Sequence, residues 1–481
     1  MIYVICGKGF LYKTPLRSGA PVDSFFDPNG VAVIGASTRP GKIGHEVLRT
    51  LVSSGYAGGI YPVNPSASSQ EILGKRCYAK LSDLPERVDL AVIVVGAESV
   101  PATIEECAAA GVRAAVIISG GFKEMGEAGA LLERRAVEAA RRGGLRLIGP
   151  NCIGISSSSS RLETFFQPRE MMARPGPGPV AVLSQSGTFG ATMLEWLAGE
   201  NLGVSKFVSY GNRSDIDEVD LLGYLAHDAS TRIVAFYVEG LGRPRRFFEL
   251  AREVGRRKPV LMLKGGRTRQ GAAAAASHTG SVAGDFGSFA GAMSQCGVVL
   301  AADAEELLDL AKLFSLAPLP AGGRVMMVTN GAGPCVIASD VISTSRSLAL
   351  ARLGPEGSDR LKRELPPFCV VGNPVDLTGS ADARSFGQAL EVLAAEPAVD
   401  ILMPVLVFQD APLGLSADEL EGVMAAARKA GKPVVAVAGG GPFTREHALH
   451  LQRAGVPVFP TATRAVTALD GFVRHAIWRR H

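Results

Sequence analysis

The sequence has 481 residues, of which 47% are hydrophobic and 20% are charged. That length exceeds what one hydrophobic core organises, so roughly two to four domains of a soluble globular protein are expected. The 50 Lys and Arg residues against 46 Asp and Glu residues give a net charge of +4. Because this charge is spread along the chain, nucleic acid and membrane surfaces are not indicated as partners.

The N-terminal segment shows no recognisable targeting signal. Its apolar stretch, "MIYVIC", is short and has no charged start, so it is not typical of a signal peptide. No apolar run in the chain approaches the roughly 18 residues of a membrane helix. The seven cysteines are scattered without a C-x-x-C pair, which indicates reduced thiols in a cytoplasmic protein. Residues 1–21 are interpreted as an extension of unknown role.

Short β-branched runs then alternate with stretches of helical period, the pattern of parallel α/β layers. Uninterrupted apolar runs suit strands that are buried on both faces of a parallel sheet. A first block of such runs lies at 31–37, 59–65, 89–97, 114–121 and 145–151.

A Pro/Gly stretch at 173–179 leads into a second block, and "SLAPLPAGGR" at 315–324 marks the start of a third. We therefore predict three doubly wound α/β domains, at 22–150, 151–318 and 319–481. The second block has strands at 180–187, 205–212, 232–240 and 259–266, and the third at 325–334, 373–379, 400–408 and 432–440.

Polar residues stand where the strands of the second block end. Ligands of open α/β sheets bind beyond the carboxyl ends of the strands, so these residues are expected to share one crevice. In "SQSGTFG" the small residues allow backbone N–H groups and a helix N-terminus to approach a phosphate, although the same turn also serves as a plain helix cap. The strand-end residues are Ser184, Gln185, Ser186, Gly187, Gly211, Asn212, Glu239, Gly240 and Lys264 to Gly266.

A lone histidine, His278, follows in "GAAAAASHTGSVAGD". A histidine that accepts a phosphoryl group needs a carboxylate to orient it, and one that passes the group on needs a mobile tether. Glu239 could supply the carboxylate, and Gly265, Gly266 and Gly271 the tether. The alternatives are an unremarkable loop histidine and a Glu239 that caps a helix or forms a surface ion pair.

The text around His278, "AASHTGSVAGD", resembles the catalytic-histidine signature of the NDP-forming acyl-CoA synthetases, relatives of succinyl-CoA ligase. The similarity runs in the family's order from about residue 22 to the last residue. It includes "VAVIGAS", "YPVNP", "GFKE", "IGPNCIG", "LSQSG", "YVEG", "TNGAGP" and "NPVDL". It implies a Rossmann-like CoA-binding domain followed by two flavodoxin-like, succinyl-CoA ligase-like domains.

For the first domain the resemblance implies a CoA site. The alternative is a nicotinamide site, but the text "GASTRPGKIG" lacks the G-x-G-x-x-G fingerprint. Family members usually carry a lysine after "VNP", where this chain has Ser66, and Lys42 or Arg39 is a possible substitute. The implied CoA-binding residues are Gly35, Ala36, Ser37, Lys42, Val63, Asn64 and Pro65.

For the other domains the resemblance implies a phosphate site and a phosphohistidine. His278 and Glu239 are the implied catalytic residues. A second phosphate-facing helix start is implied by "TNGAGP", although a simple strand-to-helix turn is the alternative. The implied phosphate contacts are Ser184, Gln185, Ser186, Gly187, Asn151, Asn330, Gly331, Ala332 and Gly333.

The chain ends at "HAIWRRH", without the roughly 200 further residues of the ATP-grasp domain that nucleotide-using members of the family have. The resemblance therefore implies the α subunit of a hetero-oligomeric acid–CoA ligase whose ATP-grasp β subunit binds ATP or ADP with Mg²⁺. It would interconvert acyl-CoA, phosphate and ADP with a small carboxylic acid, CoA and ATP. No metal ligand is expected on this chain. Two alternatives stay open: a non-catalytic CoA sensor and a nicotinamide enzyme.

Overall fold

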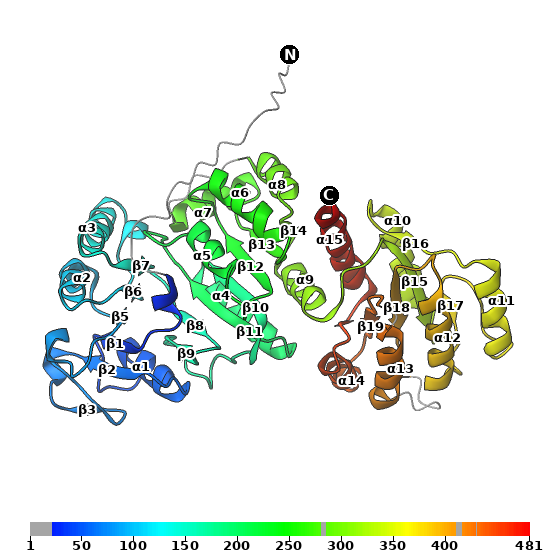
Figure 1. The fold of residues 1–481 in the computed structure, drawn as a ribbon, viewed down its shortest axis with the longest axis horizontal. Coiled ribbons are helices and arrows are strands. Elements are labelled where there is room, and N and C mark those ends of the chain that lie inside the picture. Colours follow the sequence, from blue (N-terminus) through cyan, green and yellow to red (C-terminus); the bar gives the residue numbers. More distant parts are fainter. Residues whose placement is uncertain (1–21, 280–284, 410–415, 430) are drawn as a thin grey trace, which may run out of the picture.

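The computed structural model describes residues 22–279, 285–409, 416–429 and 431–481. The predicted extension, 1–21, lies outside the described residues. Three β-sheets follow one another along the chain, and helices cover both faces of each sheet (Figure 1). The predicted α/β class with three doubly wound units is confirmed.

The first sheet is parallel throughout, with strand order β2-β1-β5-β6-β7. The strand order reverses between β1 and β5, so a ligand crevice is expected at their carboxyl ends. Every residue of β1, β5 and β6 is buried, as the apolar runs predict. The elements are β1 (Gly30–Ile34), α1 (Ile43–Ser53), β2 (Gly59–Val63), β3 (Glu71–Ile72), β4 (Lys75–Arg76), β5 (Leu90–Ile93), α2 (Val100–Ala109), β6 (Ala114–Ile117), α3 (Glu127–Gly143) and β7 (Arg146–Ile148), with β3 and β4 forming a separate hairpin.

The second sheet has the order β14-β13-β12-β10-β11-β8-β9, and two of its strand pairings are antiparallel. Strand β8 runs against β11, and β9 runs against β8. Both escape prediction because "ISSSSSRLE" is serine-rich and lacks the β-branched pattern of a strand. The elements are β8 (Ile155–Ser157), β9 (Leu162–Glu163), β10 (Pro177–Ser184), α4 (Gly187–Gly199), β11 (Val204–Ser209), α5 (Glu218–Leu225), β12 (Ile233–Val238), α6 (Pro244–Gly255), β13 (Val260–Lys264), α7 (Arg269–Thr279), α8 (Phe286–Gln295), β14 (Val299–Ala301) and α9 (Ala304–Leu316).

The third sheet has the order β16-β15-β18-β19-β20, with β17 pairing with β15. Helix α15 packs against α9, and this contact joins the third unit to the second (Figure 1). The elements are β15 (Arg324–Thr329), α10 (Gly333–Thr344), β16 (Ala349–Leu350), α11 (Pro355–Glu364), β17 (Val375–Asp376), α12 (Ala383–Ala395), β18 (Ile401–Val405), α13 (Ala417–Lys429), β19 (Ala436–Val437), α14 (Pro442–Arg453), β20 (Val458–Phe459) and α15 (Ala462–Arg480). Within the described ranges, no helix combines the length and apolar character that a bilayer crossing requires.

The segment predicted as a mobile tether is helical. Helix α7 begins at Arg269 and includes the alanine run and the backbone of His278. Alanine has the highest intrinsic helix propensity, and five consecutive alanines outweigh the small-residue character on which the tether prediction depends. The helix corrects the expectation of a loop at Arg269–Thr279, whereas the mobility of the segment stays a prediction. The segment 280–284 lies outside the described residues.

His475 of α15 is buried at the junction between the second and third units, with 2% of its surface exposed. Its Nδ1 donates to the Gly297 carbonyl oxygen at 3.2 Å, and its ring contacts those of Phe314 and Trp478. Its Nε2 is buried without a hydrogen-bond partner in the described part of the chain. Burial lowers the pKa of His475 to about 4, although the Gly297 hydrogen bond opposes the shift. The folded protein therefore holds this imidazole neutral.

This buried imidazole predicts a loss of stability in mild acid. As the pH falls from about 6.5 to about 4, His475 becomes protonated in the unfolded chain but stays neutral in the folded chain. The free energy of unfolding therefore decreases by up to about 3 kcal/mol. We expect His475→Phe to flatten this dependence in denaturant unfolding at pH 7 and pH 5. His227→Gln, at an exposed histidine, serves as the control. An equal pH dependence in His475→Phe and the wild type would contradict the assignment.

Candidate functional site

The turn after β1 is held tightly against the strands beside it. Gly35 has a φ of +90°, and a Cβ added there would lie 2.5 Å from the Val94 carbonyl oxygen. The Asn64 side-chain nitrogen donates to the Ala36 carbonyl oxygen at 2.7 Å, which ties the "VNP" segment to the "GAS" turn. The predicted residues Gly35, Ala36, Val63, Asn64 and Pro65 therefore lie together at the carboxyl ends of β1 and β2.

Helix α1 starts directly beyond this turn. A Cβ on Gly44 would lie 2.1 Å from the Gly35 carbonyl oxygen, so only glycine permits this approach of helix to turn. The Ser37 carbonyl oxygen accepts from His45 Nδ1 at 2.9 Å, and Lys42 is the exposed N-cap residue of the helix. The helix N-terminus and Lys42 together give this turn the positive character that attracts phosphate groups. Gly44 and His45 were not among the predicted residues.

The "SQSG" turn connects β10 to α4 in the second unit. Ser186 is the N-cap of α4, and its Oγ accepts from the Phe189 N–H at 3.3 Å. The Gln185 side chain has a different partner: its Oε1 accepts from the N–H groups of Glu239 and Gly240. The Gln185 amide is thus bound to the loop after β12. The groups of this turn that are available to bind an anion are those of the backbone at Ser186 and Gly187.

Glu239 lies at the carboxyl end of β12 with 6% of its surface exposed. Its carboxylate oxygen Oε1 accepts from the Tyr237 hydroxyl at 3.4 Å. Lys264, at the end of the next strand, donates from Nζ to the Glu239 carbonyl oxygen at 2.8 Å. Burial lowers the pKa of Lys264, and the nearby Glu239 charge opposes that shift. The structure therefore places a buried ammonium group beside Glu239, a role that the sequence did not reveal.

The carboxyl ends of the first two sheets meet at one seam. Gly211, after β11, has a φ of +48°, and a Cβ there would lie 2.3 Å from the Pro150 carbonyl oxygen and 2.4 Å from that of Asn151. The next residue, Asn212, donates its N–H to the Pro150 carbonyl oxygen at 2.9 Å. Asn151 is exposed at this seam, and its side-chain nitrogen lies 3.4 Å from Asn212 Oδ1. The predicted contact Asn151 is therefore beside the strand ends of both units.

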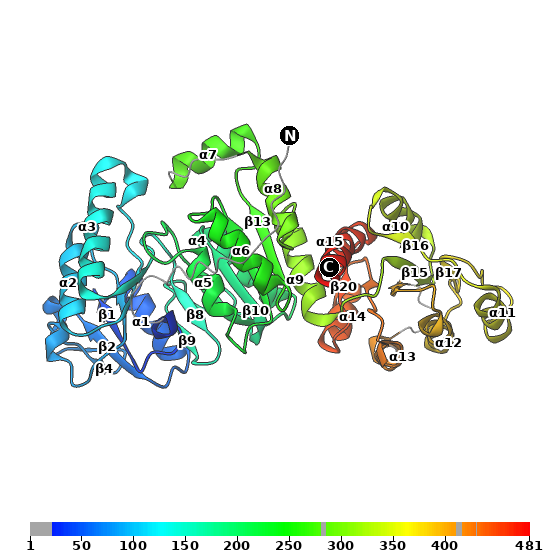
Figure 2. The same cartoon turned by 45° about the horizontal axis from the view of Figure 1, so that its top comes forward.

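Helix α7 approaches the same seam from above the second sheet. It comes close to the 3-10 helix η5 (Lys123–Met125) in the "GFKE" segment of the first unit. Figure 2 shows α7 projecting from the side of α8 toward α3. The helix that carries His278 thus bridges the first two units. The His278 side chain lies outside the described atoms, so its pairing with Glu239 stays a prediction.

The "TNGAGP" turn of the third unit is held by its own side chains. Asn330 is buried, and its side-chain amide exchanges two hydrogen bonds of 2.9 Å with the backbone of Val407. The Gly331 N–H donates to the Thr329 hydroxyl. Ala332 is the N-cap of α10 and Gly333 its first residue, and no side chain caps this helix start.

The two phosphate-type turns do not meet within one chain. In both Figure 1 and Figure 2, helices α9 and α15 stand between α4 and α10. The implied phosphate contacts at the starts of α4 and α10 therefore do not come together within this chain, and a phosphate shared by both helix starts stays a prediction.

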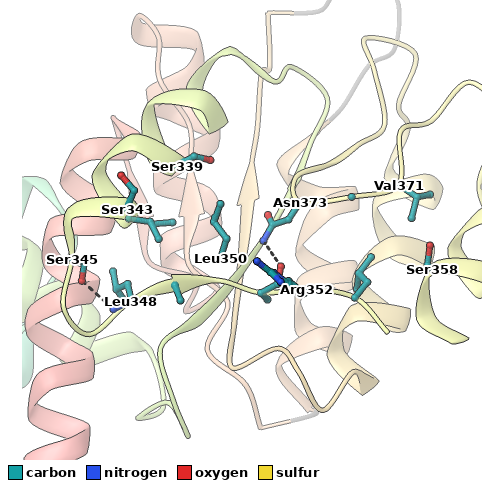
Figure 3. Close-up of a pocket in the computed structure, with 14 residues that line it drawn as sticks. Ser339, Ser343, Ser345, Leu348, Leu350, Arg352, Ser358, Val371 and Asn373 are labelled. Atoms are coloured by element: carbon teal, nitrogen blue, oxygen red, sulfur yellow. Dashed lines mark hydrogen bonds between the residues drawn. The ribbon is translucent and has the colours of Figure 1, made fainter. Parts of the chain in front are cut away.

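A cavity of about 760 Å³ lies in the third unit, beside the edge strand β16 (Figure 3). Arg352 is the charged residue of its lining, and the lining has no carboxylate or imidazole. The side chain of Asn373 donates to the carbonyl oxygens of Val325 and Ala351 at 2.8 and 3.1 Å, so it holds strands together. This cavity lacks the groups that acyl or phosphoryl transfer requires.

Family models match three consecutive stretches of the chain. Residues 29–158 match a CoA binding domain, residues 177–314 a succinyl-CoA ligase like flavodoxin domain, and residues 325–480 a Ligase-CoA domain. Together these models cover most of the chain.

Several characterised proteins are similar over nearly the whole chain. The acetate–CoA ligase (ADP-forming) I subunit alpha of Pyrococcus furiosus is 39% identical over 466 residues, which cover 95% of this chain and 98% of that protein. The acetate–CoA ligase (ADP-forming) I of Archaeoglobus fulgidus is also 39% identical, but the match covers 64% of its length. A dinucleotide-forming acetyl-coenzyme A synthetase 1 from Ca. Korarchaeum cryptofilum, solved with phosphate and ADP, superposes with a TM-score of 0.87 at 36% identity and covers 95% of this chain and 97% of its own.

The close approach at Gly211 predicts a sharp sensitivity to one methyl group. In Gly211→Ala the new Cβ meets two backbone carbonyl oxygens that cannot rotate away, so the seam must open. We expect the free energy of unfolding to fall by about 1–3 kcal/mol, as in other overpacked sites. Gly223→Ala in α5 is the matched control, since its nearest neighbour is a leucine methyl at 3.8 Å. Denaturant titration of both variants checks this, and an unchanged midpoint for Gly211→Ala would refute the close contact.

Proposed function

The chain belongs to the ADP-forming acid–CoA ligases, and we propose that it acts as the α subunit of such an enzyme. The proposed reaction interconverts acyl-CoA, phosphate and ADP with a carboxylic acid, CoA and ATP. One observation supports it above the others: at a single seam, the "GFKE" and "IGPNCIG" turns of a CoA-binding unit meet the "YGN" turn of a second unit that also carries Glu239 and α7. Acetate is the first acid to test, because it is the acid in the names of the similar enzymes.

The first proposed step is attack of phosphate on the thioester. Residues 22–150 bind CoA, with its phosphate groups near the Gly35–Ser37 turn, Lys42 and the Val63–Pro65 segment. A phosphate oxygen attacks the acyl carbonyl carbon, the carbon–sulfur bond breaks, and the thiolate of CoA leaves and takes up a proton. Of the predicted contacts Ser184–Gly187, the backbone of Ser186 and Gly187 at the start of α4 holds the phosphate, and Asn151 lies beside the reacting groups.

The second proposed step transfers the phosphoryl group to His278 within residues 151–318. An imidazole nitrogen attacks phosphorus, the bond between phosphorus and the acyl oxygen breaks, and the carboxylate leaves. Glu239 accepts a hydrogen bond from the other ring nitrogen and stabilises the positive charge that develops on the ring. Helix α7 supports this assignment because it bridges the two units at the seam.

The last proposed step occurs on another polypeptide. An ATP-grasp β subunit holds ADP and Mg²⁺ and receives the phosphoryl group from His278, which releases ATP. The residues Asn330–Gly333, at the start of α10 in residues 319–481, contact the phosphate in that hetero-oligomer. The similarity to a protein that is named as an alpha subunit supports a partner subunit. A cytoplasmic location is part of this proposal.

The function is tested with the isolated chain, acetyl-CoA and radioactive phosphate. We expect release of free CoA and a base-stable, acid-labile label on the protein, but no ATP from added ADP until a β subunit is supplied. His278→Ala should abolish the label, whereas His450→Gln, at a half-exposed histidine, should keep it. Synthesis of ATP by the chain alone, or a label that survives in His278→Ala, would contradict the proposal. Calorimetry with NAD and CoA separates a nicotinamide enzyme from a CoA enzyme.

The proposed role of Glu239 predicts a specific kinetic defect. Glu239→Gln preserves the shape of the side chain but removes the charge that supports an imidazolium ion. We expect the rate of histidine phosphorylation to fall by about 10²–10⁴, with CoA affinity unchanged. Glu253→Gln, an exposed carboxylate on α6, is the control. Rapid-quench measurement of the label gives the rates, and equal rates in Glu239→Gln and the wild type would reduce Glu239 to a structural residue.

A further inference from the structure

Two consecutive residues at the seam, Asn212 and Arg213, point to opposite sides. Asn212 faces the first unit and has 3% of its surface exposed. Its side-chain nitrogen donates to Glu124 Oε2 at 2.6 Å and to Glu133 Oε2 at 2.9 Å, and its carbonyl oxygen accepts from Lys123 Nζ. Its N–H donates to the Pro150 carbonyl oxygen, and its Oδ1 accepts from the side chain of Asn151, the residue that follows the first unit.

Arg213 reaches the other way, under the loop that follows Glu239. Its Nη1 donates to the Gly240 carbonyl oxygen and lies 3.3 Å from Glu218 Oε1. Glu218 is fully buried, and the same carboxylate oxygen accepts from the Gly242 N–H. Arg213 has a φ of +59°, a conformation that costs a non-glycine residue about 1–2 kcal/mol, so its surroundings must impose it.

The loop after Glu239 is therefore fixed from two directions. On one side the Gln185 amide binds the N–H and carbonyl groups of Gly240. On the other side Arg213 and Glu218 bind the Gly240 carbonyl oxygen and the Gly242 N–H. Of these anchors, Arg213 is the one whose chain neighbour is bonded to the first unit.

We propose that Arg213 is a positioning residue for Glu239, and that Asn212 transmits to it the state of the CoA-binding unit. The inference rests on the proposed function, which gives Glu239 its catalytic role and makes CoA the ligand of the first unit. A shift of Glu124 or Glu133 when CoA binds moves Asn212, and the adjacent Arg213 moves the backbone at Gly240. In this way CoA occupancy tightens the loop that carries the carboxylate before phosphoryl transfer begins.

The role of Arg213 is tested with the double variant Arg213→Met/Glu218→Gln. Removing both charges avoids a buried, unpaired carboxylate while it deletes the donor to Gly240. We expect amide hydrogen exchange at 240–242 to rise at least about 10-fold, as a lost loop anchor allows local opening. Histidine phosphorylation should slow by about 10²-fold with CoA affinity unchanged, because a displacement of about 1 Å suffices for such a loss.

The matched control is Arg324→Met/Asp400→Asn, which removes a two-point arginine–carboxylate pair in the third unit. It should change neither the exchange at 240–242 nor the phosphorylation rate. Arg213→Lys keeps the charge beside Glu218 but not the guanidinium fork, so it should show a partial loss even if the double variant does not fold. The proposal is overturned if the double variant exchanges its amides at 240–242 as slowly as the wild type. If the double variant does not fold, the same result in Arg213→Lys overturns it.

The role of Asn212 is tested by coupling between sites. In the wild type, saturating CoA should slow amide exchange at 240–242. In Asn212→Ala, CoA should still bind, but this slowing should disappear. Slowing that persists in Asn212→Ala, or that is absent in the wild type despite CoA binding, overturns the coupling. Exchange in the absence of CoA tests the Arg213 anchor independently of the proposed function, whereas an absent phosphate label in the wild type would refute the proposed function instead.

Discussion

The structure depends on the contact between the turn after β11 and the turn after β7. At Gly211 the two backbones approach so closely that no side chain fits between them, and Asn212 fastens the contact to Pro150. A parallel sheet and a mostly parallel one, each with its ligand-facing edge at the carboxyl ends of its parallel strands, are thereby held edge to edge. In the proposed function, CoA bound at one edge and phosphate bound at the other would react across this contact.

Most of the scaffold of this seam could be predicted from the sequence. Runs such as "DLAVIVVGA" are continuous and β-branched, and a strand buried on both faces is the structure that they favour. The turns after the strands contain Gly, Ser and Asn, and the position of Glu239 at a carboxyl end follows from its run alone. What escaped prediction had weak local signals: the serines of β8, and the alanine run of α7, whose small residues suggested flexibility where helix propensity prevailed.

Partnerships over long sequence distances were also beyond prediction. The polar residue Asn212 could be placed at a strand end, but its bonds to Glu124 and Glu133 join residues about 80 to 90 positions apart. The Gln185 amide similarly serves the loop after Glu239 rather than an anion. The third unit shows the same limit at Asn330, whose amide binds the backbone of Val407 just beyond β18. Helices α9 and α15 lie between the start of α10 and the second unit. A role for the start of α10 in phosphate binding therefore stays part of the proposed assembly with a β subunit.

A structure of the chain with CoA and phosphate tests the central role of the seam most directly. We expect the thiol end of CoA to lie beside Asn151 and the "GFKE" segment, with phosphate at the backbone of Ser186 and Gly187, close enough for a reaction between them. CoA bound away from the Gly35–Ser37 turn, or phosphate held only at the start of α10, would contradict the assignment of the seam as the site of acyl transfer.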